Sequence, residues 1–139
     1  MKKLFISCPM NGRTPEDILD SRNIMHKIAE LLWGEELEVI ASFVPNAVPS
    51  EAASSKHAAV FCLAHSIRAM ANADCFIGVD SYDFRGCSIE REVARAYDIP
   101  MHVLPADLVI PHEESERQAF ERWRARRDAG LNPYPMGIG

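Results

Sequence analysis

Short apolar runs alternate with longer amphipathic segments along most of this sequence, and this alternation limits the possible folds more than any other feature. Each run is rich in large aliphatic and aromatic residues, as buried strands are, and the segments between them repeat their apolar residues at helical spacing. A strand, a helix and a second strand in succession form a βαβ unit, with parallel strands and a right-handed crossover. The predicted strands are residues 3–7, 37–41, 74–79 and 99–104.

The segments between the strands carry recognisable helix signals. Thr14 is a suitable N-cap before Pro15 at the first helical position, and Gly34 is a suitable end for that helix. Residues 57–73 form the second predicted helix, and a third begins near Gly86. The pattern predicts an α/β, flavodoxin- or Rossmann-like three-layer fold. We expect a parallel sheet of four to five strands in the order 2-1-3-4, with helices on both faces.

Two further segments complete the predicted organisation. Residues 42–56 contain prolines and show no period, so we predict a loop that folds over the sheet edge. Residues 111–129 predict a helix with acidic residues early and arginines late, which complements the helix dipole. We therefore predict an α/β domain over residues 1–105 and a helical extension over residues 106–139, packed on the same domain. Phe120 and Trp123 give this helix an apolar patch that suits a partner subunit, so we expect a homo-oligomer, most simply a dimer.

The bulk composition narrows the function classes. A chain of 139 residues fits one compact domain, and its net charge of −5 argues against nonspecific nucleic-acid binding. The sequence has no apolar run of membrane-spanning length, and its four cysteines show no Cys-x-x-Cys pairing, so we expect reduced thiols and a cytoplasmic protein. The five histidines lack metal-ligand spacing, and dinucleotide and P-loop glycine motifs are absent. We predict no metal and no cofactor.

Residues 86–94 are the segment with the clearest chemical potential. They follow the third predicted strand, and their helical spacing places Glu90 about one turn into a helix at the carboxyl edge of the sheet. Ligands of open α/β sheets bind at that edge, and the helix dipole favours an ionised carboxylate there. Such a carboxylate can act as a glycosyl-transferring nucleophile, with Asp80 or Asp83 as a nearby proton donor. A first-turn glutamate on a solvated helix face explains the same local pattern.

Three stretches of the chain resemble the nucleoside 2-deoxyribosyltransferase superfamily, in particular its short bacterial and phage members. Residues 3–12 are similar to its opening strand and loop, and residues 73–77 to its strand after the second helix. Residues 85–94 are similar to its catalytic Gly-x-x-x-Glu-x-x-x-Ala segment. The resemblance covers about residues 2–104 in order and does not extend to the C-terminal helix.

The resemblance implies an enzyme that cleaves or transfers the N-glycosidic bond of a (deoxy)nucleoside or a nucleoside 5′-monophosphate. Glu90 would attack C1′ of the sugar and form a covalent glycosyl-enzyme, while the competing Glu92 lies six residues after Gly86 instead of the four that the motif requires. The first loop would flank the base, and the beginning of the third helix would hold a 5′-phosphate. The substrate-binding residues implied in this way are Phe5, Ser7, Cys8, Pro9, Met10, Asn11, Gly12, Ser66, Arg85, Gly86 and Ser88.

One position departs from the superfamily pattern. Its members usually carry an acidic residue eight positions before the equivalent of Asp74, to assist the departing base, and this chain has Ser66 there. A serine hydroxyl is too weak an acid for that role at neutral pH. Asp83, Asp80 or His65 would then supply the proton. The alternative function is a catalytically weak or inactive nucleotide-binding or sensing module of the same fold.

Overall fold

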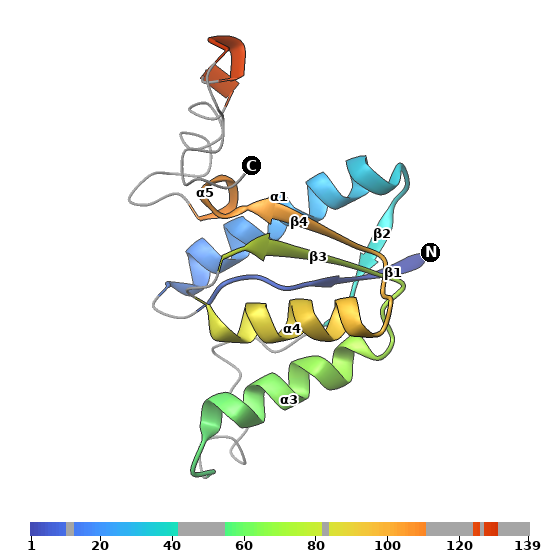
Figure 1. The fold of residues 1–139 in the computed structure, drawn as a ribbon, viewed down its shortest axis with the longest axis vertical. Coiled ribbons are helices and arrows are strands. Elements are labelled where there is room, and N and C mark those ends of the chain that lie inside the picture. The colour runs from blue at the N-terminus through green and yellow to red at the C-terminus, as the bar shows by residue number, and fades with distance from the viewer. Residues whose placement is uncertain (11–12, 42–54, 82–83, 111–123, 126, 131–139) are drawn as a thin grey trace.

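The structure, a computed structural model, contains a four-stranded parallel sheet with helices packed around it (Figure 1). It describes residues 1–10, 13–41, 55–81, 84–110, 124–125 and 127–130. The elements are β1 (Lys2–Ile6), α1 (Pro15–Trp33), β2 (Leu37–Val39), α3 (Ala58–Met70), β3 (Cys75–Asp80), α4 (Arg85–Ala96), β4 (Met101–Pro105) and α5 (Ala106–Val109). The strand order is β2-β1-β3-β4, as the sequence predicts.

The register of the sheet brings the carboxyl ends of its central strands to one edge. Ile6 at the end of β1 pairs with Ile77 in β3, and Asp80 at the end of β3 pairs with Pro105 at the end of β4. The connections that follow these three strands therefore begin side by side. In Figure 1 this carboxyl edge lies opposite the edge that carries the N-terminus.

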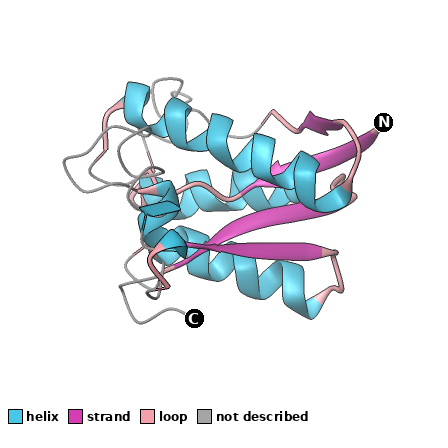
Figure 2. Ribbon diagram, turned by 90° about the horizontal axis from the view of Figure 1, so that it is seen from above, coloured by secondary structure: helices cyan, strands magenta, loops and turns pink. Residues whose placement is uncertain are grey.

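Strict alternation along the strands separates two hydrophobic cores. Leu4 and Ile6 face one side of the sheet and pack with residues of α1 and α5. Phe5 faces the other side, where it stacks on Phe76 with 5.7 Å between ring centroids, and these rings pack with residues of α3 and α4. Figure 2 shows helices on both sides of the sheet, which makes three layers. Gly78 leaves room for the Phe76 ring, because a Cβ at residue 78 would lie 2.8 Å from its Cε1 atom.

The ends of α1 follow the predicted signals. The Thr14 hydroxyl oxygen accepts a hydrogen bond from the Asp17 backbone N–H at 3.2 Å, and Pro15 occupies the first turn. Gly34 ends the helix in the left-handed conformation at φ 71°, where its N–H donates to the Glu30 carbonyl at 2.9 Å. The first βαβ unit is thus confirmed in type and position.

The start of α4 agrees with its prediction to within one residue, because the helix begins at Arg85 and Glu90 lies just over one turn into it. The one-turn helix α5 was not predicted; it buries Leu108 and Val109 directly after β4. The Ser21 hydroxyl of α1 donates to the Val109 carbonyl at 2.7 Å and holds α5 against α1.

Several predictions fall outside the residues that the structure describes. They concern most of the 42–56 loop and most of the 111–129 helix, including Phe120 and Trp123; residues 124, 125, 127 and 128 are helical. The division of the chain at residue 105 stays a prediction. Among the helices in the described part of the chain, none combines the length and apolar character needed to cross a membrane.

Candidate active site

Glu90 is a buried residue with a defined partner. Only 8% of its surface is exposed, and its Oε1 atom accepts a hydrogen bond from the Ser7 hydroxyl at 2.8 Å. Ser7 follows β1 directly, so this bond joins two segments that lie 83 residues apart in the sequence. The interpretation of Glu90 as a glutamate on a solvated helix face is therefore wrong.

The position of Glu90 follows from the core beneath it. Phe5, Met70 and Ala94 belong to the aromatic core between the sheet, α3 and α4. Helices of βαβ units run antiparallel to the strands, so earlier helix residues lie nearer the carboxyl edge. One step from this core toward that edge come Ser7 just after β1, Ser66 on α3 and Glu90 on α4, with exposed fractions of 1%, 6% and 8%. We call these three residues the polar layer.

Burial dominates the electrostatics of Glu90. It raises the pKa of this carboxyl from its ordinary 4.5 to about 7, because the anion is removed from water. The Ser7 hydroxyl and the positive charge of Arg22 both lower the pKa but only in part. The prediction that the helix dipole keeps Glu90 ionised near neutral pH is therefore wrong. Both the acid and the carboxylate are populated at pH 7.

Two buried thiols adjoin the polar layer. Burial raises the pKa of Cys8 to about 11, although Arg13 and Arg22 lower it in part. Burial likewise raises the pKa of Cys87 to about 12, against a smaller lowering by the Ser7 hydroxyl. The charge of Glu90 raises both values further. Neutral thiols are poor nucleophiles, so of these three groups only Glu90 offers an anionic nucleophile near neutral pH.

Besides Arg85, two further arginines lie at this edge of the sheet, and neither is among the substrate-binding residues that the resemblance implies. Arg13 bridges the first loop and α1, because its guanidinium donates to the Pro9 carbonyl at 2.8 Å and to the Ser21 hydroxyl at 2.7 Å. Arg91 is buried and donates to the Val79 carbonyl at the end of β3. In the sequence, only the position of Arg91 next to Glu90 indicated that it could belong to the site.

The competing glutamate lies elsewhere. The Glu92 side chain is 66% exposed and pairs with Arg95 on the outer face of α4. Residues two apart on a helix point in different directions, which explains why burial separates Glu90 from Glu92. The structure thus favours Glu90 over Glu92 as the carboxylate of an internal site.

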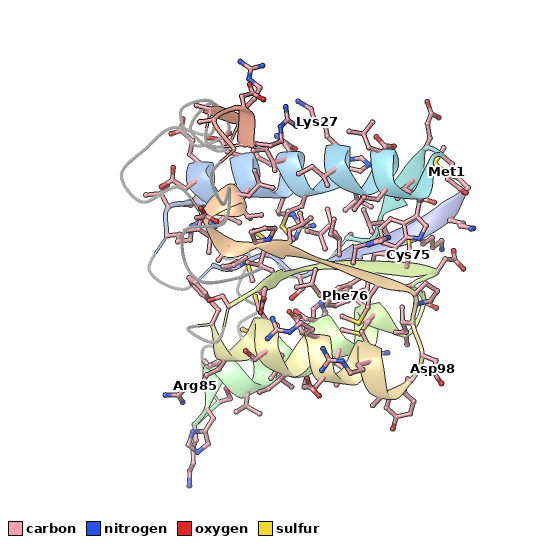
Figure 3. All side chains as sticks on the ribbon, turned by 45° about the horizontal axis from the view of Figure 1, so that its top comes forward. Met1, Lys27, Cys75, Phe76, Arg85 and Asp98 are labelled. Atoms are coloured by element: carbon pink, nitrogen blue, oxygen red, sulfur yellow. The ribbon has the colours of Figure 1, made fainter. Side chains whose placement is uncertain are left out.

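The other predicted site residues divide by position. Phe5 and Pro9 are fully buried, with the Phe5 ring stacked in the aromatic core, and Met10 packs on the opposite core. Arg85 is exposed at the beginning of α4 (Figure 3), next to the half-buried Gly86. The half-buried Ser88 donates from its hydroxyl to the Ser81 carbonyl at 3.2 Å. Asn11, Gly12 and Asp83 lie outside the described residues.

The candidate proton donors differ in their surroundings. Asp80 is half-buried at the end of β3, whereas His65 is exposed on α3. Within the described ranges, no three His, Cys, Asp or Glu side chains are grouped so that they could hold a metal ion. Comparisons with protein-family models, with curated proteins and with solved structures find no match to this chain.

The arrangement has a defined chemical capacity. A carboxyl with a pKa of about 7 exchanges readily between acid and carboxylate near neutral pH. The Ser7 hydroxyl binds one of its oxygens, Oε1, and fixes the orientation of the carboxyl group. The second oxygen is the atom that would attack an electrophile or carry the exchangeable proton.

Proposed function

We propose that the protein cleaves or transfers at the N-glycosidic bond of a (deoxy)nucleoside or a nucleoside 5′-monophosphate, through a covalent glycosyl-enzyme on Glu90. The observation that carries this proposal is the buried Glu90 carboxyl, held by Ser7 at the carboxyl edge of the sheet. The resemblance to nucleoside 2-deoxyribosyltransferases supports it. The two stretches that bear the first and last motifs, residues 3–12 and 85–94, meet at the Ser7–Glu90 hydrogen bond.

The proposed reaction has two steps. The ionised Glu90 attacks C1′ of the sugar, the C1′–N bond breaks, and its electron pair leaves with the base, which takes up a proton. The resulting glycosyl ester is then attacked by water, which gives hydrolysis, or by a second base, which gives transfer. Either attack regenerates the Glu90 carboxylate. The Ser7 hydroxyl stabilises the carboxylate at Oε1 and leaves the other oxygen for C1′.

The polar layer also supports a second candidate function, a nucleotide-binding or sensing module without turnover. Ser66 is buried at the level of Glu90, so this level of α3 offers a hydroxyl where an acid would assist the departing base. Unless another group supplies that proton, the protein binds the nucleotide without cleaving its glycosidic bond. The two functions differ in whether base is released.

Base release and binding are the two measurements that separate these functions. The protein is incubated with a panel of deoxynucleosides and their 5′-monophosphates, and free base is quantified by chromatography. We expect release by the wild type and a loss of several orders of magnitude in Glu90→Gln, which keeps size but removes the nucleophilic charge. Mass spectrometry of the quenched wild type should detect a glycosyl adduct on Glu90.

The matched control is Glu92→Gln, the same substitution on the exposed face of the same helix. It should turn over like the wild type. Full activity of Glu90→Gln would refute the covalent mechanism on this residue. Binding of nucleotides by calorimetry without base release, in both wild type and control, would instead establish the second candidate function.

A further inference from the structure

Asp107 is a buried carboxyl group with an unoccupied hydrogen-bonding oxygen. Only 6% of the residue is exposed, and its Oδ1 atom has no hydrogen-bond partner. Among the described residues, this Oδ1 atom is the only buried side-chain nitrogen or oxygen without a hydrogen-bond partner. Burying a polar atom without a partner costs free energy, and such atoms in folded proteins call for a specific explanation.

Asp107 lies at the same sheet edge as Glu90. It is the second residue of α5, which starts directly after Pro105, and Pro105 pairs with Asp80 at the carboxyl end of β3. The Ser21–Val109 hydrogen bond then draws α5 back against α1. Figure 1 shows α5 at this edge, next to the end of β4. Glu90 approaches the edge from the α4 side, and Asp107 approaches it from the α1 side.

Packing accounts for the rest of α5 but not for this carboxyl group. Leu108 and Val109 are buried apolar residues, and the Val109 carbonyl is bonded to Ser21. An apolar residue in place of Asp107 would leave no polar atom unpartnered. A carboxylate accepts hydrogen bonds and repels anions, so the missing partner is a neutral or cationic donor.

We propose that Asp107 binds a sugar hydroxyl of the nucleoside whose C1′ is placed at Glu90. The inference rests on the proposed function, because that function supplies the ligand. A hydroxyl is the donor that every nucleoside carries on its sugar, and it fits a single unoccupied acceptor atom. Asp107 is then a specificity-determining residue, and the phosphate of a monophosphate lies away from it. The bond to Oδ1 replaces the partner that the described residues do not provide.

The experiment combines deletions in the protein with deletions in the substrate. The value of kcat/KM is measured for Asp107→Ala and Asp107→Asn with a 2′-deoxynucleoside and with analogues lacking the 3′- or the 5′-hydroxyl. In the wild type, loss of the bound hydroxyl should lower kcat/KM by about 10- to 100-fold, the range for a hydrogen bond to a charged group. In Asp107→Ala, where the acceptor is already absent, deletion of the same hydroxyl should lower kcat/KM only slightly further. Asp98→Asn serves as the matched control, because Asp98 is exposed at the opposite edge and its φ of 56° suits asparagine (Figure 3).

Each result has a defined meaning. If each hydroxyl deletion lowers kcat/KM by the same factor in the wild type and in both variants, Asp107 does not bind that hydroxyl. This conclusion holds even if the variants melt at a lower temperature. If Asp107→Ala does not fold, Asp107→Asn keeps the shape and carries the test through its changed hydroxyl selectivity. If the wild type binds nucleosides without turnover, dissociation constants replace kcat/KM in the same set of protein variants and substrate analogues. A wild type that neither binds nor cleaves any nucleoside would defeat the proposed function itself, a result distinct from additive penalties in an active enzyme.

Discussion

The two edges of the sheet treat their charged side chains in opposite ways. At the amino edge, Asp74 accepts from the Lys3 backbone N–H at 2.8 Å, and Glu30 accepts from the Leu37 backbone N–H at 2.9 Å. Both carboxylates satisfy backbone donors near strand ends. At the carboxyl edge, Glu90 and Asp107 are buried, the first with a strongly raised pKa and the second with an unpartnered oxygen. One edge stabilises the fold, whereas the other holds groups at a cost in stability, as binding and catalytic sites do.

The largest expected effect tests the missing acid at the carboxyl edge. Ser66→Asp adds a carboxyl group to the polar layer beside Glu90, and two close carboxyls favour a state in which one keeps its proton. The introduced group can then protonate the leaving base, so we expect base release to rise by about 10²- to 10⁴-fold. Rates are measured by chromatography with wild type and with Ser66→Asn, which adds similar bulk without an acid. Equal rates in all three proteins would show that another group already donates the proton.

A second prediction compares the two edges by stability. The pKa of Glu90 is about 7 in the folded protein and near 4.5 when unfolded. Below pH 4.5 both states carry the proton, between these values only the folded state keeps it, and above pH 7 neither does. The penalty of Glu90 therefore grows as pH rises from 4.5 to 7. Glu90→Gln removes this titration, so its gain in the free energy of unfolding should rise from near zero at pH 4 to on the order of 3 kcal/mol at pH 8.

The control for this prediction is Glu30→Gln at the amino edge. The amide oxygen introduced by this substitution would still accept from the Leu37 N–H, and only the partly exposed pairing with His26 is lost. We expect a change of less than about 1 kcal/mol at either pH. Urea unfolding of both variants and the wild type at pH 4 and pH 8 gives the comparison. A Glu90→Gln gain that does not depend on pH would contradict the raised pKa.

The smallest expected effect concerns the pH dependence of activity. A nucleophilic Glu90 must be ionised, so kcat/KM should rise with pH, level off above about 7, and lie about tenfold lower at pH 6 than on the plateau. Ser7→Ala removes the hydrogen bond that lowers the pKa of Glu90, so the midpoint should move to higher pH. Cys8→Ala, beside the same site, should leave the midpoint in place or lower it slightly. A rate that instead falls through pH 7 would make Glu90 a proton donor rather than a nucleophile.

Much of the fold is determined by the sequence alone. The alternation of apolar runs with helical spacing fixes the βαβ order, and right-handed crossovers leave few topologies, so the strand order 2-1-3-4 could be predicted. Thr14, Pro15 and Gly34 act within their own turns, which is why the bounds of α1 follow from local residues. Glu90 could be selected as a candidate, since its spacing from Gly86 and Ala94 is local.

Only the tertiary structure decided what Glu90 is. Its burial depends on Ser7 and on the aromatic core built from β1, β3, α3 and α4, and most of that core lies far from it in the sequence. Removal from water outweighs the helix dipole, and local sequence carries no measure of that removal. The same holds for Asp107: α5 is one turn long and is held by Ser21, 88 residues before Val109 in the chain. Residue type and spacing indicate which groups can react. Long-range packing determines which of them are buried, which hydrogen bonds they form, and at which pH they ionise.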